Sequence, residues 1–112
     1  METKKAIGAL AALAQESRLK IFRLLIQYGT DGLSAGKISK LAKIPNSSLS
    51  FHLKELTYTG LISACQQGRF LFYSANFAIM TDLISFLTEN CCNGLCNPIC
   101  NPISQKSVKT NK

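Results

Sequence analysis

Two N-terminal segments of the chain carry apolar residues three or four positions apart, which is the spacing of amphipathic helices. The first helix is expected over residues 4–14 and the second over about 17–28. Gly29 and the Asp31-Gly32 pair favour turns and mark the end of the second helix. The expected inner faces are Ile7, Leu10, Ala11 and Ala14 in the first helix, and Leu19, Phe22, Leu25 and Ile26 in the second.

Two shorter helices separated by a proline follow. Ser34 is a suitable N-cap for the third helix, and Pro45 ends it because proline cannot continue a helix. Asn46 or Ser47 caps the fourth helix, and Gly60 ends it. Two short helices joined by a tight turn are typical of a helix-turn-helix unit. The expected inner faces are Ile38, Leu41 and Ala42 in the third helix, and Leu49, Leu53 and Leu56 in the fourth.

The pattern after the fourth helix is that of a β-hairpin. Residues 61–66 and 70–75 are rich in strand-forming side chains, and Gln67-Gly68-Arg69 supplies the connection in this or a near register. A fifth helix is expected over residues 77–89. The order of elements is therefore α-α-α-α-β-β-α, a mainly α fold with a small β-hairpin, which is the arrangement of a winged helix-turn-helix domain.

The last helix is apolar over more of its circumference than a surface helix requires. A surface helix normally has one apolar stripe, so a second stripe predicts that something else covers it. In so small a domain the simplest cover is an identical subunit, and we expect a homodimer that packs through the first and last helices. The two stripes are Phe77, Met80, Ile84 and Leu87, and Ile79, Leu83 and Phe86.

Length and charge narrow the class of partner. With 112 residues the chain fits one domain, and no apolar run reaches the length of a membrane span. The formal net charge is +7, and residues 34–69 carry five basic residues against Glu55 as the single acidic one. A basic block inside a folded domain favours a polyanion as partner, although charge alone fits a solvated surface equally well.

The fourth helix presents small polar and basic side chains opposite its leucines. Hydroxyls near a helix N-terminus can donate to phosphates or base edges, and Arg69 in the hairpin can reach a phosphate or the minor groove. Phe51 fits against a thymine methyl or a sugar, or else packs under a neighbouring helix. His52, the only histidine, lies beside two of the leucines, which favours a hydrogen-bonded structural role over a ligand role. The candidate contacts to double-stranded DNA are Lys37, Asn46, Ser47, Ser48, Ser50, Phe51, His52, Lys54 and Arg69.

Several runs of the chain, in order, resemble the ArsR/SmtB family of winged-helix metalloregulators over about residues 6–90. They match the family's opening segment, its recognition helix leading into the first wing strand, and its wing. The resemblance implies a dimeric repressor that binds a palindromic operator just upstream of the genes it controls. The runs are residues 12–25 (ALAQESRLKIFRLL), residues 47–56 (SSLSFHLKEL) with Gly60-Leu61-Ile62, and Gly68-Arg69 with Phe72-Tyr73.

Members of this family place inducer sites at different positions, and two of these positions lack the required residues. Residues 34–43 contain no cysteine, so the cysteine pair that some arsenic and cadmium sensors carry before the recognition helix is missing. The last helix contains no histidine, so a zinc site of Asp and His residues is unsupported. Residues 86–92 (FLTENCC) instead resemble members with an arsenic site at the C-terminal end of that helix. The candidate ligands are Cys91, Cys92, Cys96 and Cys100.

The chemistry of the cysteine cluster agrees with this resemblance. Thiolates are soft ligands that prefer thiophilic ions, and trivalent arsenic takes three sulfurs in a pyramid because it keeps a lone pair. Adjacent residues on a helix point about 100° apart, so Cys91 and Cys92 converge only where the helix ends, and Asn93-Gly94 supplies that end. We expect As(III), and also Sb(III), as the inducer, with Cys96 favoured over Cys100 as the third ligand. Another thiophilic ion (Cd, Pb or Zn), a redox switch and a tail without a ligand stay open.

The chain is thus expected to divide into a DNA-binding and dimerisation domain (1–90), a cysteine-rich inducer-binding segment (91–100) and a disordered tail (101–112). Four of its five cysteines are clustered, which favours a reduced, cytoplasmic setting over a disulfide scaffold, and Cys65 is expected to have no chemistry. An enzyme is not expected, because the chain has no Cys-x-x-Cys, no nucleophile–base pair and no glycine loop for phosphates.

Overall fold

The computed structural model describes residues 1–94 and has the winged helix-turn-helix arrangement that the sequence predicts. Cys96, Cys100 and the predicted tail lie outside the described residues, so the division at residue 90 stays a prediction. No helix within the described residues is long and apolar enough to cross a membrane. The elements, in which η denotes a 3₁₀ helix, are α1 (Thr3–Leu13), α2 (Glu16–Tyr28), η1 (Gly29–Asp31), β1 (Leu33–Ser34), α3 (Ala35–Ala42), α4 (Asn46–Tyr58), β2 (Ile62–Gln67), β3 (Phe70–Ala75), α5 (Phe77–Leu87) and η2 (Cys91–Gly94).

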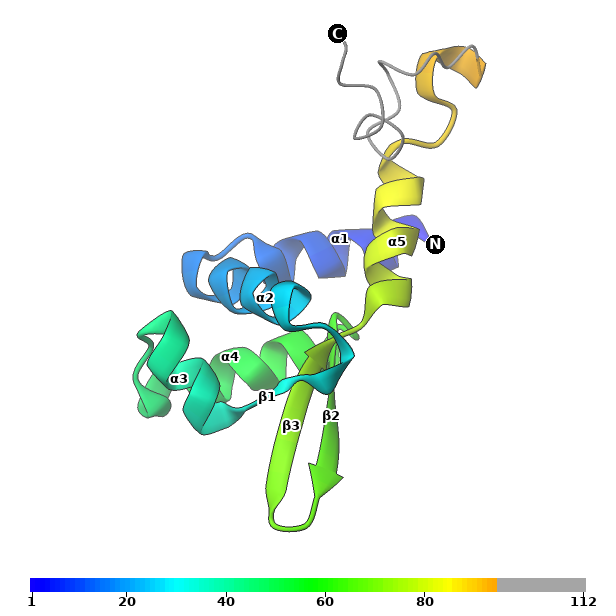
Figure 1. Cartoon of the computed structure of the whole chain (residues 1–112). Coiled ribbons are helices and arrows are strands. Elements are labelled where there is room, and N and C mark those ends of the chain that lie inside the picture. The colour runs from blue at the N-terminus through cyan, green and yellow to red at the C-terminus, as the bar shows by residue number, and fades with distance from the viewer. Residues whose placement is uncertain (95–112) are drawn as a thin grey trace, which may run out of the picture.

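The helices and the hairpin occupy different parts of the molecule. Helices α1 to α4 form the body, the β2–β3 hairpin projects from it as a wing, and α5 extends from the body beside α1 (Figure 1). The wing is antiparallel, with Ile62 opposite Ala75 at its base and Gln67 opposite Phe70 at its tip. The predicted hairpin is confirmed, and its connection is the two-residue turn Gly68-Arg69.

A third strand, β1, was not predicted. It pairs with β3 over two residues, with Leu33 opposite Tyr73, and gives an antiparallel sheet of order β1-β3-β2. Two residues are too few to show the alternation by which strands are recognised. Gly32, immediately before β1, has φ +73°, and a Cβ atom there would lie 2.5 Å from the carbonyl oxygen of Tyr73. The chain therefore needs glycine at this position to bring β1 against β3.

Replacing Gly32 by alanine is expected to lower the free energy of unfolding by at least about 2 kcal/mol, because of the left-handed backbone and the backbone contact. Gly36, in the first turns of α3, is the matched control because a Cβ there meets nothing within 4 Å. Gly36→Ala is expected to stabilise the protein by about 0.5–1 kcal/mol, the helix preference of alanine over glycine. Urea denaturation of both variants measures this difference, and equal effects of the two would contradict it.

The core lies between the four helices of the body and the base of the wing. The inner face predicted for α4 is confirmed, since Leu49, Leu53 and Leu56 are all buried. The largest fully buried side chains are Ile21, Leu25, Ile38, Leu49, Leu56, Leu61 and Ile62.

Three of the predicted inner faces are partly wrong. Helix α1 buries its alanines and leaves Ile7 (60% exposed) and Leu10 outside, because small side chains allow α1 to pack closely against the body. Leu19 is exposed and Ile21 is buried in its place. Leu41 is 42% exposed, and Ile44, just beyond α3, fills the core instead. The alanines of α1 that are buried are Ala6, Ala9 and Ala12.

The caps of the two short helices differ in how well they were predicted. The Ser34 hydroxyl accepts a hydrogen bond from the backbone N–H of Lys37 at 3.3 Å, which confirms Ser34 as the N-cap of α3. Neither Asn46 nor Ser47 caps α4, which was the prediction: the N-cap is Pro45, and it makes no side-chain cap bond. The fixed φ of proline, here −60°, already orients the chain for the first turn.

Helix α5 has the fewest buried residues of the five α-helices. Only Leu83 among its described side chains is buried, while its other large apolar side chains are half-buried or exposed, up to 57% for Leu87. The helix ends at Leu87, two residues before the predicted end, where the Thr88 hydroxyl donates to the carbonyl of Ile84 at 2.9 Å. The stripe that contains Leu83 therefore packs against the core, whereas Ile84 and Leu87 of the other predicted stripe are not covered within the described part of this chain.

Candidate nucleic-acid interface and cysteine segment

The turn between α3 and α4 fixes how α4 is presented. Lys43 adopts a left-handed backbone (φ 58°), which ends α3, and the Ser39 hydroxyl donates to the carbonyl of Ile44 at 2.6 Å. Because Ile44 is also buried, the turn is attached to the core on its inner side. Helix α4 is thereby held with its leucines inward and its opposite face outward.

The predicted DNA-contacting side chains of α4 lie mainly on that outward face. Asn46, Ser47, Ser50 and Lys54 are exposed, and Ser48 is half-buried with its hydroxyl donating to the carbonyl of Pro45 at 3.3 Å. Lys37 is exposed on α3. Phe51 is 57% exposed, so of the two placements considered for this ring, packing under a neighbouring helix does not occur.

A groove of about 470 Å³ runs between α4 and the wing. Ser50, Lys54 and Tyr58 line it from α4, and Ala64 and Tyr73 line it from β2 and β3. A concave surface between a recognition helix and a wing can accommodate a phosphodiester backbone of DNA.

Tyr58 is a candidate contact that the sequence reasoning missed. It is 89% exposed on the last turn of α4. Its spacing gave a signal, because Phe51, Lys54 and Tyr58 stand at i, i+3 and i+7 and share one helix face. A tyrosine at the edge of the groove offers a hydroxyl for a phosphate and a ring for a sugar.

The wing tip carries the predicted Arg69 beside two exposed apolar side chains. Gly68, with φ +64°, is the first residue of the turn, and Arg69 is the second. Phe70 and Leu71 follow and are both exposed. Arg69 therefore lies at the end of the hairpin, where the prediction placed it.

His52 contacts the start of α2. Its Nδ1 atom lies 3.4 Å from a terminal guanidinium nitrogen of Arg18, and the side chain is half-buried. Burial, and secondarily the positive charge of Arg18, lower the pKa of His52 from its ordinary value. These contacts match the structural role that the sequence favoured for this residue.

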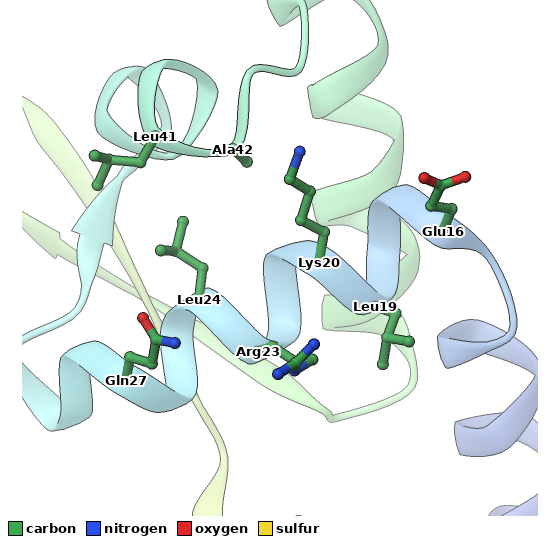
Figure 2. A pocket seen from close by; sticks show the side chains of 8 residues that line it. All are labelled: Glu16, Leu19, Lys20, Arg23, Leu24, Gln27, Leu41 and Ala42. Atoms are coloured by element: carbon green, nitrogen blue, oxygen red, sulfur yellow. The ribbon is translucent and has the colours of Figure 1, made fainter.

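A second groove, of about 440 Å³, lies on the other side of the helix-turn-helix unit, between α2 and the end of α3. Figure 2 shows Leu24 of α2 directed toward Leu41 and Ala42 of α3, with Lys20 and Arg23 on the same helix as Leu24. Leu41, which was predicted to lie in the core, is exposed and lines this groove instead. None of the predicted DNA contacts lines this groove.

Cys91 and Cys92 follow the end of α5 and lie outside regular helix. Asn90, Cys92 and Asn93 all have positive φ, between 54° and 59°. The helix thus ends before the cysteines rather than at Asn93-Gly94, and the sulfurs of Cys91 and Cys92 are 3.8 Å apart. The two sulfurs therefore lie close together, while their convergence on a bound ion stays a prediction.

The other predicted ligands cannot be placed. Cys96 and Cys100 lie outside the described residues, and within residues 1–94 no group of three His, Cys, Asp or Glu side chains could hold a metal ion. Cys65 is exposed on β2, opposite Phe72 and far along the chain from the cluster.

Comparison with known proteins agrees with the fold and the helix-turn-helix unit. Residues 13–63 match a family model described as a helix-turn-helix domain. The transcriptional activator HlyU of Vibrio cholerae is 31% identical over 79% of this chain and 79% of that protein. The transcriptional repressor SdpR of Bacillus subtilis is 34% identical over 68% of this chain and 81% of that protein. A putative arsenical resistance operon repressor, ArsR, of Halobacterium salinarum is 36% identical over 60% of this chain and 51% of that protein.

Solved structures give the same result. An ArsR-like transcriptional regulator from Rhodococcus sp. RHA1 aligns with a TM-score of 0.67 and 25% identity, over 75% of this chain and 76% of that one. Reduced HlyU from Vibrio cholerae aligns with a TM-score of 0.60 and 29% identity, over 81% of this chain and 93% of that one.

Proposed function

Because this chain belongs to the ArsR/SmtB family of winged helix-turn-helix transcriptional regulators, we propose that it is an arsenite-responsive repressor. It binds operator DNA as a homodimer and leaves the operator when its C-terminal thiolates capture As(III). The observation that carries the proposal is the 3.8 Å separation of the Cys91 and Cys92 sulfurs directly beyond α5. The relative named as a putative arsenical resistance operon repressor supports the same inducer.

DNA binding uses the outward face of α4 and the wing. The exposed Ser47, Ser50 and Lys54 face the major groove, where hydroxyls and an ammonium group can donate to phosphates and base edges. Arg69 reaches the backbone or the minor groove from the wing. The groove between α4 and the wing receives the intervening phosphate backbone.

The homodimer forms through α1 and α5. These two helices lie beside each other and leave apolar side chains uncovered, among them Ile7, Leu10 and Leu87. Exposed apolar side chains that lie together often mark a protein–protein interface. A second copy that packs its own α1 and α5 against them completes an isologous interface.

The inducer site consists of Cys91, Cys92 and a third thiol. Thiolates suit a thiophilic ion, and a pair that already lies close together needs little rearrangement to bind one atom. Cys96 is favoured over Cys100 as the third ligand because the short loop from Cys92 can fold back. When bound, As(III) would bond to these three thiolates. The change in conformation that follows would be made by the protein chain alone.

The cysteines control DNA binding through the subunit interface. Joining thiols on both sides of Cys92 changes the backbone just beyond α5, and α5 belongs to the dimer contact. Two recognition helices must stand roughly 34–36 Å apart to enter successive major grooves, so a small rotation of the subunits disrupts the fit. A coupling energy of about 1–3 kcal/mol corresponds to a 5- to 150-fold loss of affinity.

A mobility-shift titration of the full chain tests the proposal, with a duplex taken from immediately upstream of its own gene. We expect arsenite to release the duplex, and zinc and hydrogen peroxide to leave the complex intact. Release by zinc, cadmium or lead but not by arsenite would assign another thiophilic ion. A redox switch is the second candidate, because two sulfurs 3.8 Å apart can be oxidised together. Release by peroxide alone would favour it.

Lys54→Ala is expected to weaken operator binding and to reduce the slope of log K against log salt by about 1, the loss of one phosphate contact. Lys5→Ala is the matched control, since Lys5 is also exposed but belongs to α1. Fluorescence anisotropy at several salt concentrations measures both variants. The same slope change in the two would show that Lys54 contributes only net charge.

A further inference from the structure

Arg18 is the residue at which three helices meet. Its Nε atom donates to the carbonyl of Ala12, near the end of α1, at 2.7 Å. A terminal nitrogen of the same guanidinium lies 3.4 Å from Nδ1 of His52 on α4. Its backbone N–H donates to the side-chain oxygen of Gln15, the N-cap of α2, at 2.9 Å. The guanidinium is therefore held by α1 on one side and by His52 on the other. If it moved along with His52, its hydrogen bond to the carbonyl of Ala12 would break.

The chemistry of this contact fixes the protonation of His52. A guanidinium is always charged and can only donate hydrogen bonds, so Nδ1 of His52 must be the acceptor. An acceptor at Nδ1 leaves the proton of the neutral ring on Nε2. The other tautomer would place two N–H groups against each other, and the imidazolium would add a second positive charge beside Arg18.

The surroundings of His52 act in the same direction. Burial and the charge of Arg18 both lower the pKa of His52, so the neutral ring is favoured. The end of α1, residues 9–14, carries no charged group, and the charged groups on the other two elements around His52 are Glu16, Arg18, Lys20 and Arg23 on α2 and Lys54 and Glu55 on α4.

His52 lies between the buried leucines of α4 and the exposed Phe51. The ring of Phe51, which is exposed, packs edge-on against the imidazole, with ring centres 5.8 Å apart at 63°. The imidazole itself is only half-buried. A neutral ring that donates at Nε2 suits a phosphate oxygen or an acceptor such as N7 or O6 of guanine.

From these contacts we infer that Arg18 is a positioning residue for DNA recognition: anchored on α1, it holds His52 as the neutral Nε2–H tautomer, so that α4 presents a hydrogen-bond donor at this position. The inference rests on the proposed DNA-binding function of α4. It adds Arg18, a residue of α2, to the residues that determine which hydrogen-bonding groups the recognition helix presents to DNA.

Long-range ¹H–¹⁵N NMR of the full chain tests the first half without any DNA, and it is unambiguous because the chain has a single histidine. Ring nitrogen shifts separate the two neutral tautomers and the imidazolium. We expect the Nε2–H form to predominate at neutral pH, with the pKa of His52 below that of a histidine in a short peptide. A predominant Nδ1–H form, or an imidazolium at neutral pH, would overturn the inference whatever the variants do.

Arg18→Gln removes the charge and both guanidinium contacts, the one to the carbonyl of Ala12 and the one to Nδ1 of His52. It is expected to raise the pKa of His52 and to give a mixture of tautomers. Arg23→Gln is the matched control, an exposed arginine on the same helix that makes no contact with His52 in the described residues. It should leave the His52 titration unchanged. Equal titration curves for the wild type and Arg18→Gln would overturn the role of Arg18.

The second half is tested by replacing His52 with side chains that imitate one ring nitrogen each. Glutamine places an amide donor near the position of Nε2, and asparagine places it near Nδ1. We expect His52→Gln to bind the operator duplex within about threefold of the wild type and His52→Asn to lose on the order of tenfold, the contribution of one hydrogen bond. Equal affinities of both variants would exclude His52 as a donor to DNA. A wild-type chain that bound no duplex would refute the proposed function itself, while the NMR result would stand.

Discussion

Serine at position 91 or 92 is expected to leave operator binding unchanged and to abolish its response to arsenite. Neither cysteine lies near α4 or the wing in the sequence, and serine keeps the size of the side chain while removing the soft donor. The wild type should lose 5- to 150-fold in affinity when arsenite is added, the range of typical allosteric couplings, and the variants should lose nothing. Mobility shift measures the affinity, and ultraviolet sulfur–arsenic absorption measures binding to the thiols directly.

Cys65→Ser is the matched control, because Cys65 is exposed on β2 and distant from the cluster in the sequence. It should respond to arsenite like the wild type. Comparison of Cys96→Ser with Cys100→Ser identifies the third ligand: loss of the absorption band at 96 but not at 100 supports the ligand set proposed above. A persistent arsenite response in both Cys91→Ser and Cys92→Ser would remove the inducer site from the end of α5.

A charge in the uncovered stripe of α5 is expected to separate the subunits. Ile84 is half-buried in the single chain, and a carboxylate there would have to be desolvated in the dimer. Ile84→Glu should therefore be monomeric by analytical ultracentrifugation at micromolar concentration. Loss of the second half-site contact should reduce operator affinity on the order of 100-fold or more.

Ser85→Glu introduces the same charge one residue further along the same helix. Ser85 is exposed and stands about opposite the buried Leu83, so this variant should stay dimeric and bind the operator. A dimeric Ile84→Glu variant with normal operator affinity would show that α5 is not the subunit contact.

Periodicity predicted the elements that have one apolar face. Leu49, Leu53 and Leu56 stand at i, i+4 and i+7 with mainly polar residues between them, and all three are buried as expected. The wing was predicted for a related reason, since two runs of strand formers flank a glycine-containing turn. In both cases the order of apolar and polar residues was compatible with only one way of burying the apolar side chains.

Periodicity was insufficient where two faces of a helix are apolar. Helix α1 has larger residues such as Ile7 on one side and alanines on the other, and the packing chose the alanines. Side-chain size is a poor guide here because close helix packing favours small residues. Similarly, Leu41 follows Ile38 at a helical spacing and is nevertheless exposed, whereas Ile44 reaches the core from beyond the left-handed turn at Lys43, where helix periodicity no longer applies.

The candidate site was predictable to a different degree in each part. The outward-facing residues of α4 follow from the helix register, and Tyr58 was overlooked although it shares that register. The contact between Arg18 and His52 joins residues 34 positions apart and leaves no local signal. The convergence of Cys91 and Cys92 was predicted from the need to leave the helix, whereas the point at which α5 ends was not, since it depends on the hydroxyl of Thr88 bonding back to Ile84.

Ser34 has two roles that tie separate parts of the molecule together. It is the last residue of β1, paired with Phe72 in the wing, and at the same time its hydroxyl caps α3. Bending between the wing and α3 would have to break both the pairing of Ser34 with Phe72 and the hydrogen bond that caps α3. We therefore expect α3 and the wing to move together, so that a signal arriving through α5 tilts them as one unit.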